Sequence, residues 1–209
     1  MATRIDRSFI SPAEYPNGMA WDGTCICDAD GGSGRIYRIA PDSGEVVRVI
    51  ETPCRTSSGL TWDGTCFWYT EGRICVLFRI DPADGRILSY VKSPGPSPHG
   101  IDWDGDALWN SDIQTDTIYR LNPETGAVLT SFPSPATRPH GLAWDGVFIW
   151  SADTNERIIY KLHPKAGEVV DRVWCPDGTE PHGLTWDGTH LWYDDTGGRR
   201  IHRLSTTDG

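Results

Sequence analysis

One phrase, repeated five times, constrains the fold of this chain more than any other feature. The hexapeptide Gly-x-x-Trp-Asp-Gly begins at residues 18, 59, 100, 141 and 183, so it recurs every 41 residues and once after 42. A period this regular indicates an array of equal units that bury their apolar faces against one another. The five units account for nearly all of the 209 residues, and we therefore expect a single domain over residues 1–209.

Each unit is predicted to contain four short strands. In the fourth unit, the alternation of apolar residues and the turn residues place strands over 141–144, 148–151, 157–162 and 168–174. Asp145-Gly146 is typical of a tight turn, because Asp bonds its own backbone and Gly accepts a positive φ. No segment has a helical period. The sequence predicts an all-β, five-bladed β-propeller with four antiparallel strands in each blade.

The two ends of the chain indicate how the ring closes. The fifth unit stops soon after its third strand, and residues 4–9 align with the fourth strand of the preceding unit, residues 169–174. We therefore expect residues 3–10 to be the outer strand of the last blade, where they would cover an exposed sheet edge.

The composition limits which binding partners and which cellular compartment are expected for the protein. A formal net charge of −10 argues against nucleic acid, whose phosphates would be repelled. The N-terminal residues lack a signal-like apolar stretch and no window is long enough to span a membrane, so we expect a cytoplasmic protein with no membrane partner, and a monomer. Six cysteines without an even framework are predicted to be reduced. The expected partner is a small-molecule substrate or ligand.

Several columns of the repeat are predicted to be structural. The motif tryptophans and a second column six residues later are expected to pack between blades. Cys27 replaces the tryptophan of the second column in the first unit, which predicts looser packing there and leaves a metal or redox role for Cys25 and Cys27 open. A basic column near the end of the third strand is expected to aid solubility or to pair with an acid of a neighbouring blade. Its members are Arg38, Arg79, Arg120, Lys161 and Arg203.

Two further columns carry groups that can do chemistry. The residues just before the opening Gly are Asn17, Ser58, His99, His140 and His182, and those nine residues after the motif Trp are Asp30, Glu71, Asp112, Asp153 and Asp195. Because the first two strands of a blade are antiparallel, both columns are expected at one mouth of the central channel. The alternative for both is structural: the histidines would bond the next blade's backbone, and the acids would cap their own loops.

The histidines belong to adjacent blades, which predicts a metal site. His99, His140 and His182 would hold one divalent ion, of unknown identity, and leave the side of Asn17 and Ser58 open for substrate. The acids would orient the imidazoles or act as general base. We expect Glu71 to be the proton acceptor, beside Tyr69.

A column at position seven after the motif Trp differs from blade to blade, and we expect substrate specificity to lie there. Its members are Asp28, Tyr69, Asn110, Ser151 and Tyr193. From this column Tyr69 is a candidate catalytic residue and Tyr193 a candidate substrate contact.

The repeated pattern Pro-x-Gly-Leu-x-Trp-Asp-Gly, followed by Leu-Trp-x-x-Asp and Ile-Tyr-Arg-Leu, resembles the blades of the virginiamycin B lyase family and of the wider NHL-type propellers over the whole chain. The resemblance implies a metal-dependent elimination that opens an ester-linked ring, assisted by a histidine and an acid. The matching positions here are His182 or His140, with Glu71 or Asp195. Glutaminyl cyclases share the five-blade count and similar Trp-Asp-Gly turns.

Two functions follow as hypotheses. The first is a metal-supported lyase or hydrolase that acts on a small molecule at the channel mouth. The second is a non-catalytic propeller, either lectin-like and multivalent or a protein-interaction module, with ligands in the grooves between blades. The asymmetry of the axial column, three histidines among five positions, favours the enzyme.

Overall fold

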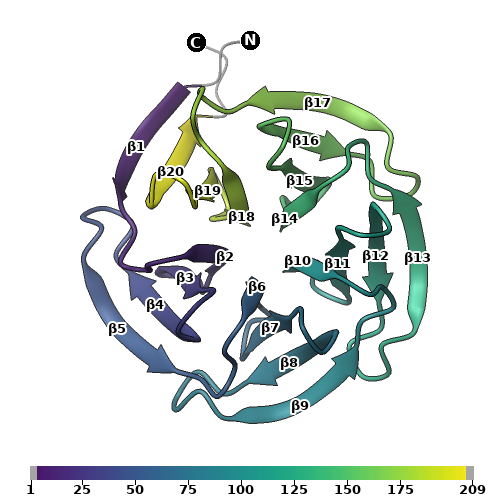
Figure 1. Ribbon diagram of the computed structural model, residues 1–209, viewed down its shortest axis with the longest axis horizontal. Helices are drawn as coiled ribbons and strands as arrows, with labels where there is room; N and C mark the ends of the chain where they lie inside the picture. Colours follow the sequence, from purple (N-terminus) through teal and green to yellow (C-terminus); the bar gives the residue numbers. More distant parts are fainter. Residues whose placement is uncertain (1–3, 206–209) are drawn as a thin grey trace.

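The computed structural model describes residues 4–205 as five sheets of four antiparallel strands arranged in a ring (Figure 1). Within these residues all the regular structure is β, so the predicted five-bladed propeller is confirmed. Among them no helix is long and apolar enough to cross a membrane.

The blades are numbered in chain order, and the strands of each are given from the axis outward. Blade 1 consists of β2 (Pro16–Trp21), β3 (Ile26–Asp30), β4 (Arg35–Ile39) and β5 (Val46–Glu51). Blade 2 consists of β6 (Ser57–Trp62), β7 (Phe67–Glu71), β8 (Val76–Ile80) and β9 (Ile87–Lys92). Blade 3 consists of β10 (Pro98–Trp103), β11 (Leu108–Asp112), β12 (Thr117–Leu121) and β13 (Val128–Pro133). Blade 4 consists of β14 (Pro139–Trp144), β15 (Ile149–Asp153), β16 (Ile158–Leu162) and β17 (Val169–Trp174). Blade 5 consists of β18 (Pro181–Trp186), β19 (Leu191–Asp195), β20 (Arg200–Ser205) and, outermost, β1 (Arg4–Ile10).

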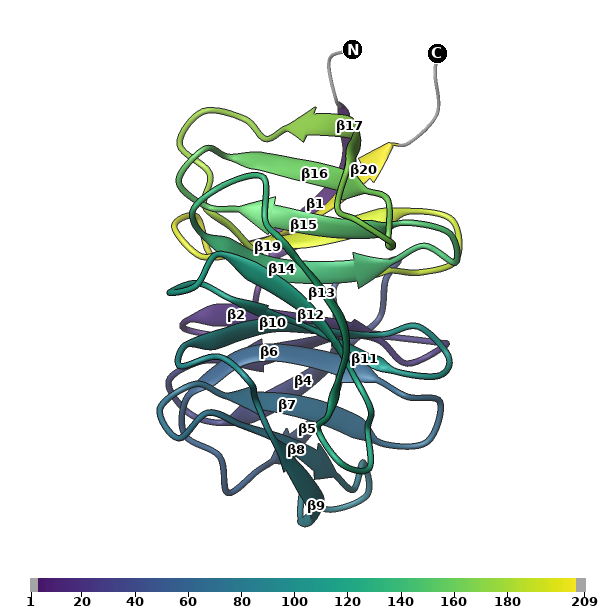
Figure 2. The same ribbon diagram turned by 90° about the vertical axis from the view of Figure 1, so that its right-hand side faces the viewer.

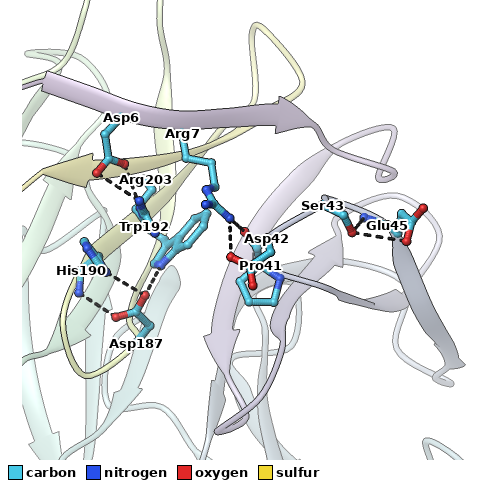
Figure 3. Close-up of polar contacts among 10 residues, drawn as sticks. All are labelled: Asp6, Arg7, Pro41, Asp42, Ser43, Glu45, Asp187, His190, Trp192 and Arg203. Atoms are coloured by element: carbon cyan, nitrogen blue, oxygen red, sulfur yellow. Dashed lines mark hydrogen bonds and ion pairs between the residues drawn. The ribbon is translucent and has the colours of Figure 1, made fainter.

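The ring closes as predicted, because the first strand of the chain completes the last blade. β1 pairs antiparallel with β20, from Arg4 opposite Ser205 to Ile10 opposite Arg200. Figure 1 shows this purple strand along the outside of the yellow one. Arg203 of β20 holds β1 through a bidentate bond to Asp6, with its Nε 2.8 Å from Oδ1 (Figure 3). Thr3, the first residue of the predicted strand, lies outside the described residues.

The strands run between two faces of the ring, with the connecting loops at both (Figure 2). One face carries the Trp-Asp-Gly turns and the turns between the third and fourth strands, and we call it the turn face. The opposite face carries the starts of the inner strands and the ends of the second strands, including His99, His140 and His182, and we call it the histidine face.

The motif aspartate anchors each turn to its blade. In blade 3, Oδ2 of Asp104 accepts bonds from the indole Nε1 of Trp109 at 2.9 Å and from Nε of Arg120 at 2.6 Å, while Oδ1 accepts the turn N–H of Ala107. Blades 2, 4 and 5 repeat the indole bond. The tryptophans of this second column, Trp68, Trp109, Trp150 and Trp192, are at most 5 % exposed, so their predicted burial is confirmed. The motif tryptophans are half-buried against the core clusters.

The structure corrects the partner predicted for the basic column. We expected these residues to aid solubility or to pair with an acid of a neighbouring blade, but the first four members pair with the motif aspartate of their own blade. The strand pairing explains this, because the third strand lies directly beside the second. In blade 3, Arg120 is opposite Trp109, and both side chains bond the same aspartate. In blade 5, Arg203 turns instead to Asp6 of the strand added outside it.

The cysteines are all free thiols, as predicted. Cys27 is fully buried, and its Sγ lies 3.5 Å from Oδ2 of Asp22, in the place where the other blades put an indole N–H. Burial raises the pKa of the Cys27 thiol, and the charge of Asp22 raises it further. A protonated, buried thiol is a poor nucleophile and a poor metal ligand, which argues against a redox role.

Candidate functional site

A β-bulge at the start of each inner strand positions the axial column. In blade 4, Pro139 pairs with Asp153 but the next paired residue is Leu142, opposite Ser151, so the strand contains one extra residue at His140-Gly141. The other four inner strands have a bulge at the same place. Bulges re-aim side chains and are frequent beside functional sites. Here the bulge contains the histidine and the glycine that follows it.

The three histidines come together at the axis. The ring centres of His99 and His140 are 4.8 Å apart, and those of His140 and His182 are 4.2 Å apart. His140 is 2 % exposed and His182 is 7 % exposed, whereas His99 is half-buried. The clustering expected from the repeat is present in the structure.

Hydrogen bonds orient all three rings through the same nitrogen. Nδ1 of His140 lies 3.0 Å from the carbonyl oxygen of Arg138, and Nδ1 of His99 lies 3.3 Å from that of Ser97. Nδ1 of His182 lies 2.6 Å from Oδ1 of Asn17. Because these partners only accept, each Nδ1 carries the proton and each Nε2 keeps its lone pair. Backbone and side-chain acceptors at Nδ1 are the usual second layer behind histidines that bind through Nε2.

The histidines are neutral at physiological pH. Burial lowers the pKa of His140 to about 2, and the neighbouring His182 and His99 lower it further. Burial also lowers the pKa of His182 to about 3, with His99 and Arg138 acting in the same direction and Asp195 opposing them. Burial lowers the pKa of His99, against the carbonyl of Ser97. A nitrogen lone pair that stays unprotonated can bind a metal ion or accept a hydrogen bond, but it is a poor base for taking up a proton.

The structure adds Arg138, a residue that the sequence analysis missed. Its Nη2 lies 3.4 Å from Nε2 of His140, and its side chain is exposed at the rim. It stands two residues before the histidine of its blade, and the same position in the other blades is Tyr15, Thr56, Ser97 and Glu180. It is the one basic residue of this column, and that is its signal in the sequence. The ring of Tyr15 meets the ring of His182 edge-on at 6.3 Å.

The acidic column ties loops together. Each acid accepts a backbone N–H from the loop before the inner strand of its blade, at 2.6–3.3 Å. Asp30, Asp112 and Asp153 also accept N–H groups of their own following loop. These bonds match the loop-capping alternative. Glu71 is held most weakly, because its bond from the N–H of Thr56 is the longest of the five, at 3.3 Å.

The position-seven column is buried inside the ring. Tyr69 and Tyr193 are 0 % exposed and their hydroxyl groups are buried, so neither hydroxyl is open to solvent. Each packs in one cluster with an alanine of the preceding blade, Ala29 for Tyr69 and Ala152 for Tyr193. In these two blades a large residue of the column packs with a small residue of the preceding blade, as a close-packed interior requires.

Of the two polar axial residues, Asn17 has a positioning role. Its Nδ2 donates to the carbonyl oxygen of Ser57 at 2.7 Å, which fixes Oδ1 toward His182. Ser58 is half-buried on the neighbouring inner strand. Both belong to blades 1 and 2, on the side of the axis that carries no histidine.

The donor set suits a metal ion, but the arrangement as it stands is not a finished metal centre. Three imidazoles bound to one ion at about 2.0–2.1 Å would have ring centres roughly 5 Å apart, close to the observed separations. Over residues 4–205, however, no group of three or more His, Cys, Asp or Glu side chains is arranged to hold a metal ion. The guanidinium of Arg138 faces the lone pair of His140, so ion binding requires this exposed side chain to move.

Comparisons with known proteins place this geometry among propellers that include enzymes. Protein-family models and curated proteins give no match. Among solved structures, glutaminyl cyclase from Myxococcus xanthus superimposes with a TM-score of 0.83 at 14 % identity, over 98 % of this chain and 96 % of the other. At this identity the likeness concerns the fold alone.

Virginiamycin B lyase from Staphylococcus aureus shares 27 % identity with the chain, with a TM-score of 0.59, over 92 % of this chain and 66 % of the lyase. The resemblance predicted from the repeats is confirmed. A catalytically inactive histidine-to-alanine variant of that lyase, solved with quinupristin, matches with the same identity and TM-score. The present chain spans about two thirds of the length of the lyase.

Proposed function

We propose that the protein is a lyase or hydrolase that acts on a small molecule at the axis of the histidine face, with a divalent ion held by His99, His140 and His182. The observation that carries the proposal is the set of three adjacent, neutral imidazoles, each oriented by an acceptor at Nδ1. A bound divalent ion supplies a Lewis acid that polarises a carbonyl group.

The other groups of the rim have separate tasks in this proposal. Arg138 is exposed beside His140, and a guanidinium in that place binds a carboxylate or a developing oxyanion of the substrate. Glu71 is the proton acceptor, because it is the acid least held by backbone bonds and its longer side chain can reorient. Asn17 keeps the tautomer of His182, and Ser58 lines the open side. Asp195 holds the N–H of Glu180 and so supports the rim beside His182.

The resemblance to the lyase supports the class of reaction. A histidine is needed for activity in that enzyme, as its inactive histidine-to-alanine variant shows, and quinupristin is bound to that variant. The shorter chain here brings three histidines to its axis. We therefore expect an ester-linked or otherwise carbonyl-containing small molecule, and quinupristin is the first substrate to test.

We expect His140→Ala to abolish metal binding and to lower the turnover rate at least 100-fold. General acid–base and metal-assisted steps each contribute at least about 10²-fold to the rate. Elemental analysis after incubation with Mg²⁺, Mn²⁺ or Zn²⁺, and chromatography of quinupristin, measure the two effects. His163→Ala, on a turn of the opposite face, is the matched control and should retain both.

Glu71→Gln separates the proton step from binding, since we expect it to keep the metal and lose turnover. If His99→Ala, His140→Ala and His182→Ala all leave metal content and melting temperature unchanged, the proposed centre is wrong. If metal binds as expected and quinupristin is untouched, the substrate is a different carbonyl compound, and a panel of esters and lactones tests the reaction class.

A further inference from the structure

A hollow on the turn face lies between blades 2 and 3, on the face of the ring opposite the histidines. It has a volume of about 450 Å³, within the usual range for small-molecule sites. Its walls come from the first turn and outer strand of blade 2, and from Trp103 and the turn at Pro123-Glu124 of blade 3. We propose that this groove binds a neutral saccharide ring, independently of the axial site.

The side chain in the middle of the outer strand differs from blade to blade, and it affects how open the neighbouring groove is. The middle of each outer strand lies opposite the basic column of the third strand, and two blades carry an arginine there, Arg7 opposite Arg203 and Arg48 opposite Arg38. Blade 2 has Ser89 at this place, opposite Arg79. A serine is too short to reach the next blade.

The two arginines cross to the neighbouring blade and fill the corresponding grooves. Arg7 donates from Nη1 to the carbonyl oxygen of Pro41 at 2.7 Å and pairs with Asp42, in the turn of blade 1 (Figure 3). Arg48 donates in the same way to the carbonyl oxygen of Ala83 in blade 2. The hollow beside Arg48 measures only about 280 Å³. Ser89 therefore leaves a space that the two arginines narrow at the junctions of blade 5 with blade 1 and of blade 1 with blade 2. Thr130 and Asp171 hold the equivalent positions of blades 3 and 4.

Aromatic faces line the open groove. Trp103 is half-buried at its base, and Tyr90 is 62 % exposed at its edge, where the ring of Phe78 meets it at 6.2 Å. Trp68, which is almost fully buried, also lines the groove, and its indole N–H is already bonded to Asp63. Rigid aromatic surface of this kind suits a flat ligand with one apolar face.

The charges of the groove select against ionic ligands. Arg79 and Asp63 neutralise each other at 2.9 Å, which removes the cation that a phosphate or carboxylate would need. Arg79 also disfavours a cationic ligand beside the aromatic rings. Glu124 of the turn, together with the hydroxyl groups of Ser89 and Tyr90, offers acceptors and donors around the rim. A sugar ring combines an apolar face for Trp103 with hydroxyl groups for this rim.

The test places in blade 2 the arginine that blades 1 and 5 carry at the same position of their outer strands. Wild-type protein is titrated with N-acetylglucosamine, galactose, mannose and their disaccharides while tryptophan emission is followed, and we expect at least one to bind with a Kd in the millimolar range or below. Ser89→Arg should weaken that binding at least ten-fold and leave the melting temperature unchanged, because the new arginine can cross to the turn of blade 3. Arg48→Ser, which widens the groove between blades 1 and 2, should leave saccharide binding between blades 2 and 3 unchanged.

Three results would overturn the proposal: no saccharide binds, binding survives Ser89→Arg, or a quaternary ammonium ion binds at this groove in place of a sugar. His140→Ala is included to keep the two sites apart. It should leave saccharide binding unchanged, so a failure of the axial proposal has no bearing on this one.

Discussion

Replacing Asp194 by asparagine is expected to stabilise the protein at pH 8 and to leave its stability nearly unchanged at pH 4. Asp194 of β19 and Asp28 of β3 are fully buried where blade 5 meets blade 1. Oδ1 of Asp194 accepts the N–H of Gly183 at 2.8 Å, and Oδ2 of Asp28 accepts the hydroxyl of Ser11 at 2.5 Å. The second oxygen of each carboxyl group has no hydrogen-bond partner among the described residues.

Two carboxylates cannot both be charged in this place. Burial raises the pKa of Asp28, and the charge of Asp194 raises it further, against the bond from Ser11. Burial raises the pKa of Asp194 to about 7, with Asp195 adding to the effect and Gly183 opposing it. In the unfolded chain both groups have a pKa near 3.9. The folded state therefore holds protons that the unfolded state has lost, so stability falls as pH rises from about 4 to about 7.

An asparagine removes this penalty, because its side chain is neutral at every pH and its Oδ1 can keep the bond from Gly183. A pKa raised from about 3.9 to about 7 corresponds to a cost of about 4 kcal/mol at pH 8, and we expect Asp194→Asn to recover about 2–4 kcal/mol of the free energy of unfolding. Urea denaturation at pH 4, 6 and 8 measures it. Equal effects at pH 4 and pH 8 would contradict the conclusion that the pKa of Asp194 is raised in the folded protein.

Asp187→Asn is the matched control, with the opposite sign. The indole of Trp192 and the N–H groups of Thr189 and His190 outweigh burial and lower the pKa of Asp187. Its substitution should destabilise the protein at pH 7 and do less harm near pH 3. Burial also raises the pKa of Asp102 to about 7, so only the difference between variant and wild type isolates the pair at the junction of blades 5 and 1.

The repeat made the ring predictable because it reports on packing that every blade must satisfy. The turn at Asp145-Gly146, the indole column and the closing strand each recur or align, and each was found where the period placed it. The inner strand was predicted from Gly141 but begins at Pro139. The difference is the bulge, which depends on the register between two strands and is not visible in the alternation of apolar residues.

The parts of the site that the sequence did not reveal depend on three-dimensional contacts that the repeat does not report. Arg138 occurs once in its column, so no repetition pointed to it. The column of Tyr69 is expected to carry specificity because it varies from blade to blade, and the packing of Tyr69 with Ala29 of the preceding blade was not visible in the repeat. The pairing of Arg120 with Asp104 depends on which strands are neighbours in one sheet, and the sequence left its partner open.

The glycines at the axis allow the inner strands to approach one another closely. Gly100→Ala is therefore expected to lower the free energy of unfolding by about 3 kcal/mol or more. A Cβ at Gly100 would lie 2.0 Å from the carbonyl oxygen of His140 and 2.9 Å from the N–H nitrogen of Leu142. Both are backbone atoms of β14, which cannot turn aside as a side chain can. The inner strands approach so closely that the space between them at the level of the glycines holds no room for a water molecule.

The same substitution links the fold to the site, since β14 can relieve the clash only by carrying His140 away from His99 and His182. We therefore expect Gly100→Ala to lower metal binding along with the melting temperature, measured by thermal unfolding and elemental analysis. Gly32→Ala is the control, because its Cβ would meet the carboxylate of Asp30 at an ordinary 3.4 Å on an exposed loop. A Gly100→Ala protein as stable as Gly32→Ala would mean that the blades can separate at the axis, and a closed axis is what holds the three imidazoles in contact.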